Sequence, residues 1–138
     1  MAHKDGEFTL YTDGASRGNP GDAGAGVVLL DGSGAVVATA KKYLGVCTNN
    51  EAEYRALILG LEEALKRKMR HLKIFLDSEL IVRQIEGIYR VKNKNLQGLM
   101  KEVRKLLSFL DSYTVAHVER HLNAAADRLA NQAIDEAM

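Results

Sequence analysis

Residues 8–13, FTLYTD, and residues 72–77, LKIFLD, have the same pattern: each is an apolar, strand-like segment that ends on an aspartate. Counted back from the aspartates, Phe8 matches Leu72 and Leu10 matches Ile74. The second segment follows a long helical pattern, so we expect strands at Phe8–Thr12 and Leu72–Leu76 that pair parallel through a right-handed crossover. The carboxylates of Asp13 and Asp77 would then emerge at the same sheet edge, where open α/β sheets place their sites.

Periodicity and turn signals predict the elements around these two strands. A glycine-rich loop follows Asp13, and its Pro20 is the only proline of the chain. The capping box formed by Thr48 and Glu51 starts a long helix, and Asn123 is the expected N-cap of the last one. The remaining predicted elements are strands at Ala23–Leu30, Ala35–Leu44 and Tyr113–Val118, and helices at Asn49–Lys68, Ser78–Ile85, Leu96–Leu110 and Ala124–Met138.

Three strands followed by alternating helices and strands favour a mixed α/β sheet with helices packed on it. A length of 138 residues fits one domain, residues 1–138, and we expect residues 1–6 to be flexible. Hydrophobic residues make up 46% and charged residues 27%, which excludes a disordered chain. Cys47 is the only cysteine, so no internal disulfide forms, and no apolar run is long enough to span a membrane. We therefore expect a cytoplasmic protein.

The net charge of +1 hides an uneven distribution, because residues 64–105 hold 12 basic and 4 acidic side chains. Such a basic stretch provides the phosphate attraction that nucleic-acid binding needs. A solvated helix face is the better interpretation for Lys66–Arg70 and for Lys101–Lys105. Arg90, Lys92 and Lys94 are the better candidates for phosphate contacts.

Two further carboxylates do not fit an ordinary surface pattern. Glu53 shares the apolar stripe of its helix with Leu57 and Leu61, and Asp127 shares a face with Asn131. Each acidic residue alone has an ordinary alternative, as a turn residue, a helix cap or a partly exposed helix residue. Together, four carboxylates without histidine or thiol favour Mg²⁺ or Mn²⁺ over Zn²⁺, and two such ions can promote phosphodiester hydrolysis.

Four segments carry a family resemblance. TDGASRGNPG at residues 12–21, TNNEAEY at 48–54, DSE at 77–79 and NAAADRLA at 123–130 resemble, in order, the four motifs of type 1 ribonuclease H. The similarity extends from about Phe8 to Ala133. It implies the α/β ribonuclease H-like fold, a five-stranded mixed sheet with three antiparallel strands and then two parallel ones, flanked by helices.

The resemblance implies an endonuclease that cleaves the RNA strand of RNA–DNA hybrids and leaves 5′-phosphate and 3′-hydroxyl ends. Asp13, Glu53, Asp77 and Asp127 would be the catalytic, metal-binding carboxylates for two Mg²⁺ ions, with Mn²⁺ as a substitute. Asp13 would bridge both ions, Asp127 would hold the ion that activates water, and Glu53 and Asp77 the ion near the leaving oxygen.

The resemblance also implies contacts with both strands of the hybrid. The backbone at Gly14 and Ala15, with Asn19, Asn49 and Glu79, would contact the RNA strand and its 2′-hydroxyls, which distinguish RNA from DNA. Thr48 and Asn50 would lie against the DNA strand.

The chain departs from many family members because Gly87–Leu96 leaves no room for their long basic insertion. Arg90, Lys92 and Lys94 lie where that insertion would be. The segment before the fourth motif is short, and there His121 is a candidate for the histidine that assists product release, with a surface position as the alternative. Arg120 is a candidate contact for the scissile phosphate or Asp127, and Asn123 is a further auxiliary candidate.

Two other functions remain open at this stage. One is a hybrid-binding or double-stranded-RNA-binding module whose chemistry is vestigial, and the other is a related nuclease of the same fold, such as a DNA resolvase or a 3′–5′ exonuclease. No oligomerisation element is evident, so we expect a monomer without a membrane partner.

Overall fold

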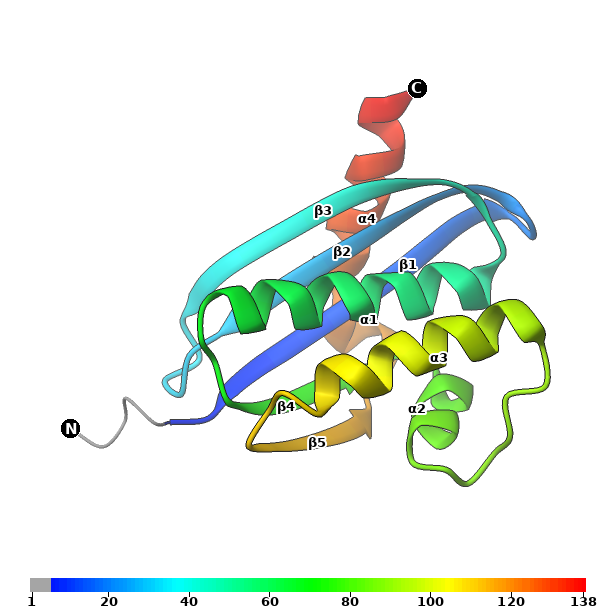
Figure 1. The fold of residues 1–138 in the computed structure, drawn as a ribbon. Coiled ribbons are helices and arrows are strands. Elements are labelled where there is room, and N and C mark those ends of the chain that lie inside the picture. Colours follow the sequence, from blue (N-terminus) through cyan, green and yellow to red (C-terminus); the bar gives the residue numbers. More distant parts are fainter. Residues whose placement is uncertain (1–5) are drawn as a thin grey trace.

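Five strands form a single mixed sheet in the order β3-β2-β1-β4-β5 (Figure 1). The computed structural model describes residues 6–138, so the flexibility expected for residues 1–6 falls, apart from Gly6, outside the described residues. Pairing is antiparallel between β1 and β2 and between β2 and β3, and parallel between β1 and β4 and between β4 and β5. The predicted mixed sheet is confirmed. The strand bounds are β1 Phe8–Gly18, β2 Gly21–Leu30, β3 Val36–Cys47, β4 His71–Leu76 and β5 Ser112–His117.

Helices cover both faces of the sheet (Figure 1). The helices α1 and α3 lie on one face, and α4 crosses the other face behind β1, β2 and β3. One apolar core fills the space under α1 and α3 and includes Leu10, Leu57 and Ile74, all without exposed surface. The helix bounds are α1 Asn49–Lys66, α2 Glu79–Ile85, α3 Lys94–Leu107 and α4 Ala124–Ala137, with a 3₁₀ turn at Arg120–Asn123.

The expected parallel register of the two aspartate-bearing strands is present. Phe8 pairs with Leu72, Leu10 with Ile74, and Tyr11 with Phe75, whose rings stack at a centroid distance of 5.2 Å. This pairing ends at Tyr11 and Phe75, so the residues that follow them lie near each other where β4 ends and β1 continues.

The sequence prediction for the glycine-rich segment is wrong. We expected a loop after Asp13, but β1 continues to Gly18 and pairs with β2 as far as Gly21, so that only Asn19 and Pro20 form the turn. The glycine at position 14 serves a different purpose from a turn, because a Cβ there would lie 2.2 Å from the backbone of Ala52 in α1. Glycine therefore lets α1 approach β1 closely.

The starting point of α1 agrees with its sequence signal. The hydroxyl of Thr48 accepts from the backbone N–H of Glu51, and the Glu51 carboxylate accepts from the N–H of Thr48. Both halves of the capping box are thus formed, so Glu51 is occupied as a cap. Two residues further on, Glu53 is left for another role.

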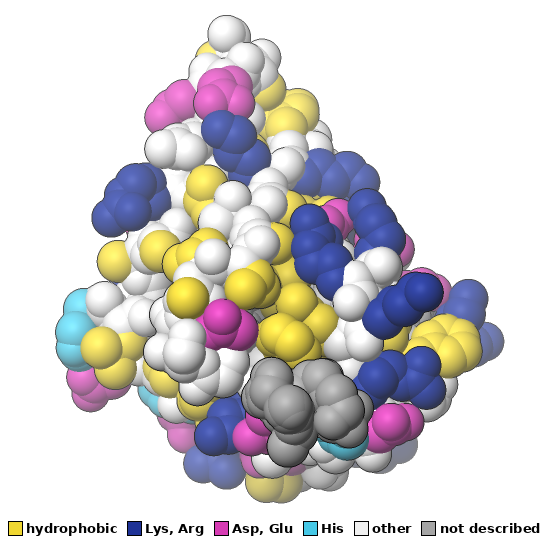
Figure 2. Space-filling view, turned by 90° about the vertical axis from the view of Figure 1, so that its left-hand side faces the viewer, with side chains coloured by type: hydrophobic (Ala, Val, Ile, Leu, Met, Phe, Trp, Pro, Cys, Tyr) yellow, Lys and Arg dark blue, Asp and Glu magenta, His cyan; other side chains and the backbone are white. Residues whose placement is uncertain are grey.

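Positive charge is unevenly spread over the surface. Figure 2 looks at the side that is on the left in Figure 1, and Lys and Arg side chains are more numerous over its right half, beside an apolar strip. At the C-terminal end of α1, the exposed side chains of Lys66 and Arg67 pair with Glu63 at 3.2 and 2.7 Å. These cations thus belong to a solvated helix end, the interpretation favoured by the sequence.

Within residues 6–138, none of the helices is both long enough and apolar enough to cross a bilayer.

The contact between α4 and β2 gives a test of the packing. A Cβ at Gly26 would lie 2.0 Å from the carbonyl oxygen of Ala126, so Gly26→Ala must push α4 away from the sheet. We predict a loss of about 2–3 kcal/mol in the free energy of unfolding, measured by urea denaturation. The control is Gly98→Ala in α3, where a Cβ meets no atom within 4 Å, and it should be stabilising by about 0.5–1 kcal/mol. Equal effects of the two substitutions would contradict this account of the packing.

Candidate active site

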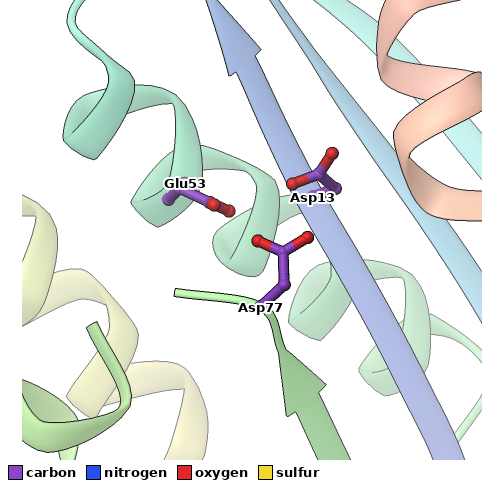
Figure 3. A group of neighbouring side chains, drawn as sticks. All are labelled: Asp13, Glu53 and Asp77. Atoms are coloured by element: carbon purple, nitrogen blue, oxygen red, sulfur yellow. The ribbon is translucent and has the colours of Figure 1, made fainter. Parts of the chain in front are cut away.

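Three acidic side chains from three different elements meet where β1 and β4 cease to pair (Figure 3). Asp13 lies on β1, Glu53 on the second turn of α1, and Asp77 directly after β4. One carboxylate oxygen from each of the three residues lies within 4.8 Å of the corresponding oxygens of the other two. Residues separated by up to 64 positions therefore form one cluster.

The close packing of α1 on β1 places Glu53. Because residue 14 is glycine, the α1 backbone approaches the strand, and the N–H of Gly14 donates to Glu53 Oε1 at 3.0 Å. This bond fixes one oxygen of the glutamate against the strand that carries Asp13. The prediction that Glu53 points inward, rather than into solvent, agrees with this geometry.

The side chain of Asn123 orients Asp77. Its Nδ2 donates to the Thr12 carbonyl at 2.9 Å and to Asp77 Oδ2 at 3.0 Å. We expected this side chain to cap α4, but it makes no cap hydrogen bond to the helix. Asn123 occupies the predicted N-cap position, but its buried amide bonds to Thr12 of β1 and to Asp77 after β4 instead of to the helix.

Asp127 lines the same cavity as the cluster but lies outside the group of three. The cavity has a volume of about 320 Å³. The carboxylate of Asp127 accepts a hydrogen bond of 3.3 Å from the side-chain amide of Asn131, one turn further along α4. The complete lining is Asp13, Gly14, Ala15, Ser16, Asn49, Glu53, Asp77, Arg120 and Asp127.

Burial and crowding of like charges raise the pKa values of two members of the cluster. Burial, followed by the charges of Glu53 and Asp77, raises the pKa of Asp13 far above its ordinary value of 3.8, and Asp127 adds to the effect. Burial and the charge of Asp77 raise the pKa of Glu53 to about 8, although the Gly14 N–H and Arg120 act in the opposite direction. Without a cation, the site therefore favours the protonated carboxyl groups.

Six of the seven residues expected to contact substrate divide between two cavities. Gly14, Ala15 and Asn49 line the carboxylate cavity. Asn19, Thr48 and Asn50 line a second cavity of about 430 Å³ together with Asn93 and Asn95 near the start of α3. The two cavities are neighbours, because Asn19 Oδ1 accepts from the backbone N–H of Asn49 at 3.0 Å.

Glu79, which was predicted to contact the RNA strand, and most of the predicted auxiliary residues lie outside the carboxylate cavity. Glu79 is exposed on α2 and pairs with Arg83 at 3.2 Å. The His121 side chain is 71% exposed, with its Nδ1 3.6 Å from Glu119. Arg120 alone of this group lines the cavity. The exposed residues Arg90, Lys92 and Lys94 lie in and directly after the connection between α2 and α3, beside Asn93 and Asn95 of the second cavity.

The sequence did not indicate some residues of these cavities. Ser16 lines the carboxylate cavity, and its hydroxyl donates to the Cys47 carbonyl at 2.9 Å, which ties β1 to the end of β3. Asn93 and Asn95 reach the second cavity only because α3 folds back beside the start of α1. Only Asn93 carried a local signal, since its side chain accepts from the N–H of Leu96 as an N-cap.

Known proteins resemble the chain over nearly its whole length. A family model described as reverse transcriptase-like matches residues 11–133. Ribonuclease HI of Halobacterium salinarum is 41% identical over 132 residues, which cover 96% of this chain and 66% of that protein. A bifunctional protein of Mycobacterium tuberculosis is 42% identical over 95% of this chain and 36% of its own length. The chain thus spans from about a third to two thirds of these relatives.

Solved structures agree with the sequence matches. RNase H1 from the halophilic archaeon Halobacterium salinarum superposes with a TM-score of 0.93 at 40% identity, covering 95% of this chain and 99% of that one. LC11-RNase H1, solved in complex with an RNA/DNA hybrid, gives a TM-score of 0.89 at 40% identity over 94% of this chain and 98% of the other. Only eight residues connect α2 and α3, which leaves no room for a long basic insertion. The chain therefore belongs to the type 1 ribonuclease H family as a compact member that lacks this insertion.

Proposed function

We propose that this chain is a hydrolase, an endoribonuclease that cleaves the RNA strand of RNA–DNA hybrids with the help of divalent metal ions. The observation that carries the proposal is the cluster of Asp13, Glu53 and Asp77, with Asp127 in the wall of the same cavity. The family membership and the hybrid bound to the related LC11-RNase H1 support the choice of substrate.

The residues of the cavity fit Mg²⁺ or Mn²⁺. The cluster offers only carboxylate oxygens, which these hard cations prefer, and the raised pKa values of Asp13 and Glu53 reflect the repulsion that a cation would relieve. Burial and the charges of Glu53, Asp77 and Asp127 all raise the pKa of Asp13, so a cation held by Asp13 would relieve repulsion from each of these carboxylates. When bound, two ions would activate a water and stabilise the leaving oxygen of a phosphodiester.

The chemistry that we propose is hydrolysis at the 3′ oxygen. The water oxygen adds to phosphorus and loses a proton, while the P–O3′ bond breaks and the leaving oxygen gains a proton. The products are a 5′-phosphate and a 3′-hydroxyl end. Arg120, which lines the cavity, would place its guanidinium toward the phosphate that is cleaved.

The two neighbouring cavities provide a place for each strand of the hybrid. Gly14, Ala15 and Asn49 beside the carboxylates would face the RNA strand. Thr48 and Asn50 in the second cavity would face the DNA strand, and Asn19, which lines that cavity and accepts from the Asn49 N–H, would contact the RNA strand. Since Asn49 and Asn50 are consecutive at the start of α1, a single helix turn would contact both strands.

Two alternatives make different predictions for substrate choice. A vestigial module would bind a labelled hybrid without cleaving it in Mg²⁺ or Mn²⁺, and a related nuclease of the same fold would cleave DNA. Incubation with RNA–DNA hybrid, double-stranded RNA, double-stranded DNA and single strands separates these functions in one gel. We expect cleavage of the RNA strand of the hybrid only.

The carboxylate cluster gives a direct mutational test. Asp13→Asn and Asp77→Asn should each lower the rate of hybrid cleavage by on the order of 10³-fold, because each removes a negative oxygen ligand while preserving shape. The control is Glu62→Gln, an exposed change on the same helix as Glu53, which should retain cleavage. Cleavage is followed with a labelled hybrid, and circular dichroism checks the fold. Near-normal activity of either aspartate variant would refute the assignment.

The raised pKa values predict how stability depends on pH in the metal-free protein. The pKa values of Asp13 and Glu53 lie above those of the unfolded chain, so the folded chain keeps protons that the unfolded chain releases. The free energy of unfolding should therefore fall as the pH rises from about 4.5 through about 8. Urea denaturation in EDTA at pH 5 and pH 8 measures the fall, and Glu53→Gln should make it smaller. Glu62→Gln, an exposed change on the same helix, should leave it unaltered.

The basic segment before α3 predicts salt-dependent binding. Replacing Lys92 and Lys94 together with alanine should weaken hybrid binding and lower the slope of log K against log salt by about 1–2, if each lysine neutralises one phosphate. The matched control replaces Lys101 and Lys105, exposed on α3. Fluorescence anisotropy in Ca²⁺ or EDTA measures binding without cleavage. An equal loss in the two double variants would show that general charge, and not this segment, attracts the hybrid.

A further inference from the structure

The sheet opens at the point where the carboxylates gather. The parallel pairing of β1 with β4 ends at Tyr11 and Phe75, whereas the pairing of β4 with β5 continues to Leu76 and His117. Strand β1 therefore separates from β4 two residues before Asp13 and Asp77. The separation makes room for the cluster, but it also leaves Thr12, which pairs with Val27 of β2, without a strand partner on the β4 side.

The amide of Asn123 fills this opening. Its Nδ2 donates one hydrogen bond to the Thr12 carbonyl and one to Asp77 Oδ2, so it replaces the ladder bond of β1 and holds one oxygen of Asp77. Both neighbours are acceptors, so only the NH₂ group can face them and the orientation of the amide is fixed. The same Asp77 carboxylate also contributes one oxygen to the cluster with Asp13 and Glu53.

The burial of this amide argues against a role in stability alone. Asn123 is 1% exposed, and within residues 6–138 its Oδ1 has no hydrogen-bond partner. A buried acceptor without a partner costs free energy, which a residue chosen only for packing would avoid. What this amide provides is a pair of N–H donors, one for the Thr12 carbonyl in β1 and one for the Asp77 carboxylate directly after β4.

The same residue links a third part of the site. Asn123 directly precedes α4, and Asp127 lies one helical turn later on that helix. The contacts of its side chain with β1 and β4 therefore also fix where α4 begins relative to both strands. A shift of this amide would move Asp77 and Asp127 relative to Asp13.

We propose that Asn123 is a positioning residue that sets the spacing of Asp13, Asp77 and Asp127 and thereby the affinity of the site for divalent ions. The inference rests on the proposed function for its catalytic meaning, but the link between Asn123 and Asp77 is a property of the metal-free fold. Partners that orient metal ligands in this way typically change metal affinity by about 10–100-fold when removed.

The first test compares two buried amides. Gln84 accepts a hydrogen bond of 2.6 Å from the buried hydroxyl of Tyr54, away from the carboxylates, so Gln84→Ala matches Asn123→Ala in the loss of a buried amide. Asn123→Ala should raise the Mg²⁺ concentration for half-maximal cleavage about tenfold or more and leave KM for the hybrid nearly unchanged. It should weaken Mn²⁺ binding to the protein alone, measured by calorimetry, by a similar factor. Gln84→Ala should lower stability without either effect.

A normal metal requirement in Asn123→Ala, or an equal shift in Gln84→Ala, would overturn the proposal. If Asn123→Ala does not fold, Asn123→Ser is measured instead, because its hydroxyl retains one donor. It should give a smaller shift of the same sign, and an absent shift counts against the proposal.

The second test needs neither metal nor cleavage. In EDTA, the loss of stability caused by Asn123→Ala should be clearly smaller in an Asp77→Ala background than in the original protein, because the shared hydrogen bond is already gone. In an Asp31→Ala background, in the turn between β2 and β3, the loss should be the same as in the original protein. Additive effects of Asn123→Ala and Asp77→Ala would overturn the positioning role. Non-additive effects in a protein that cleaves no hybrid would instead refute only the proposed function.

Discussion

The parallel register between β1 and β4 is the constraint on which the site depends. Leu10 opposite Ile74, and Tyr11 stacked on Phe75, fix the register of the two strands, so Asp13 and Asp77 lie just beyond the last paired residues of β1 and β4. A shift by one residue would turn the side chains of one strand to the opposite face and bury the wrong set. The apolar core under α1 enforces the register, and the chemistry at the sheet edge follows from it.

The cluster works against the stability of the fold that carries it. Burial and like charges raise the pKa values of Asp13 and Glu53, so ionising both in the metal-free protein costs free energy. Hydrogen bonds from the Gly14 N–H and the Asn123 amide hold two of the carboxylates in place despite their repulsion. A site prepared in this way has its ligands already arranged before a cation arrives, and a cation would relieve the repulsion.

The glycines show why the local sequence does not predict every element of the structure. The residues after Asp13 suggested a loop, because glycine and proline are typical of turns. In the structure, Gly14 and Gly26 lie within strands and permit close contact with the backbones of α1 and α4. The same absence of a Cβ serves a turn and a close approach equally well, and the distinction depends on which helix packs against the strand. Asn123 is similar, since an asparagine before a helix predicts a cap, while its burial between two strands gives the amide other partners.

The sequence by itself determined the order of the elements, the capping box at Thr48, the shared frame of the two aspartate-bearing strands and the inward direction of Glu53. Each of these depends on periodicity or on contacts between residues a few positions apart. Only the tertiary structure decided that β1 continues past Asp13, that Asn123 bridges Thr12 and Asp77, and that Asn93 and Asn95 share a cavity with Asn50. These features join segments that lie far apart along the chain, and their geometry follows from how closely the helices pack on the sheet.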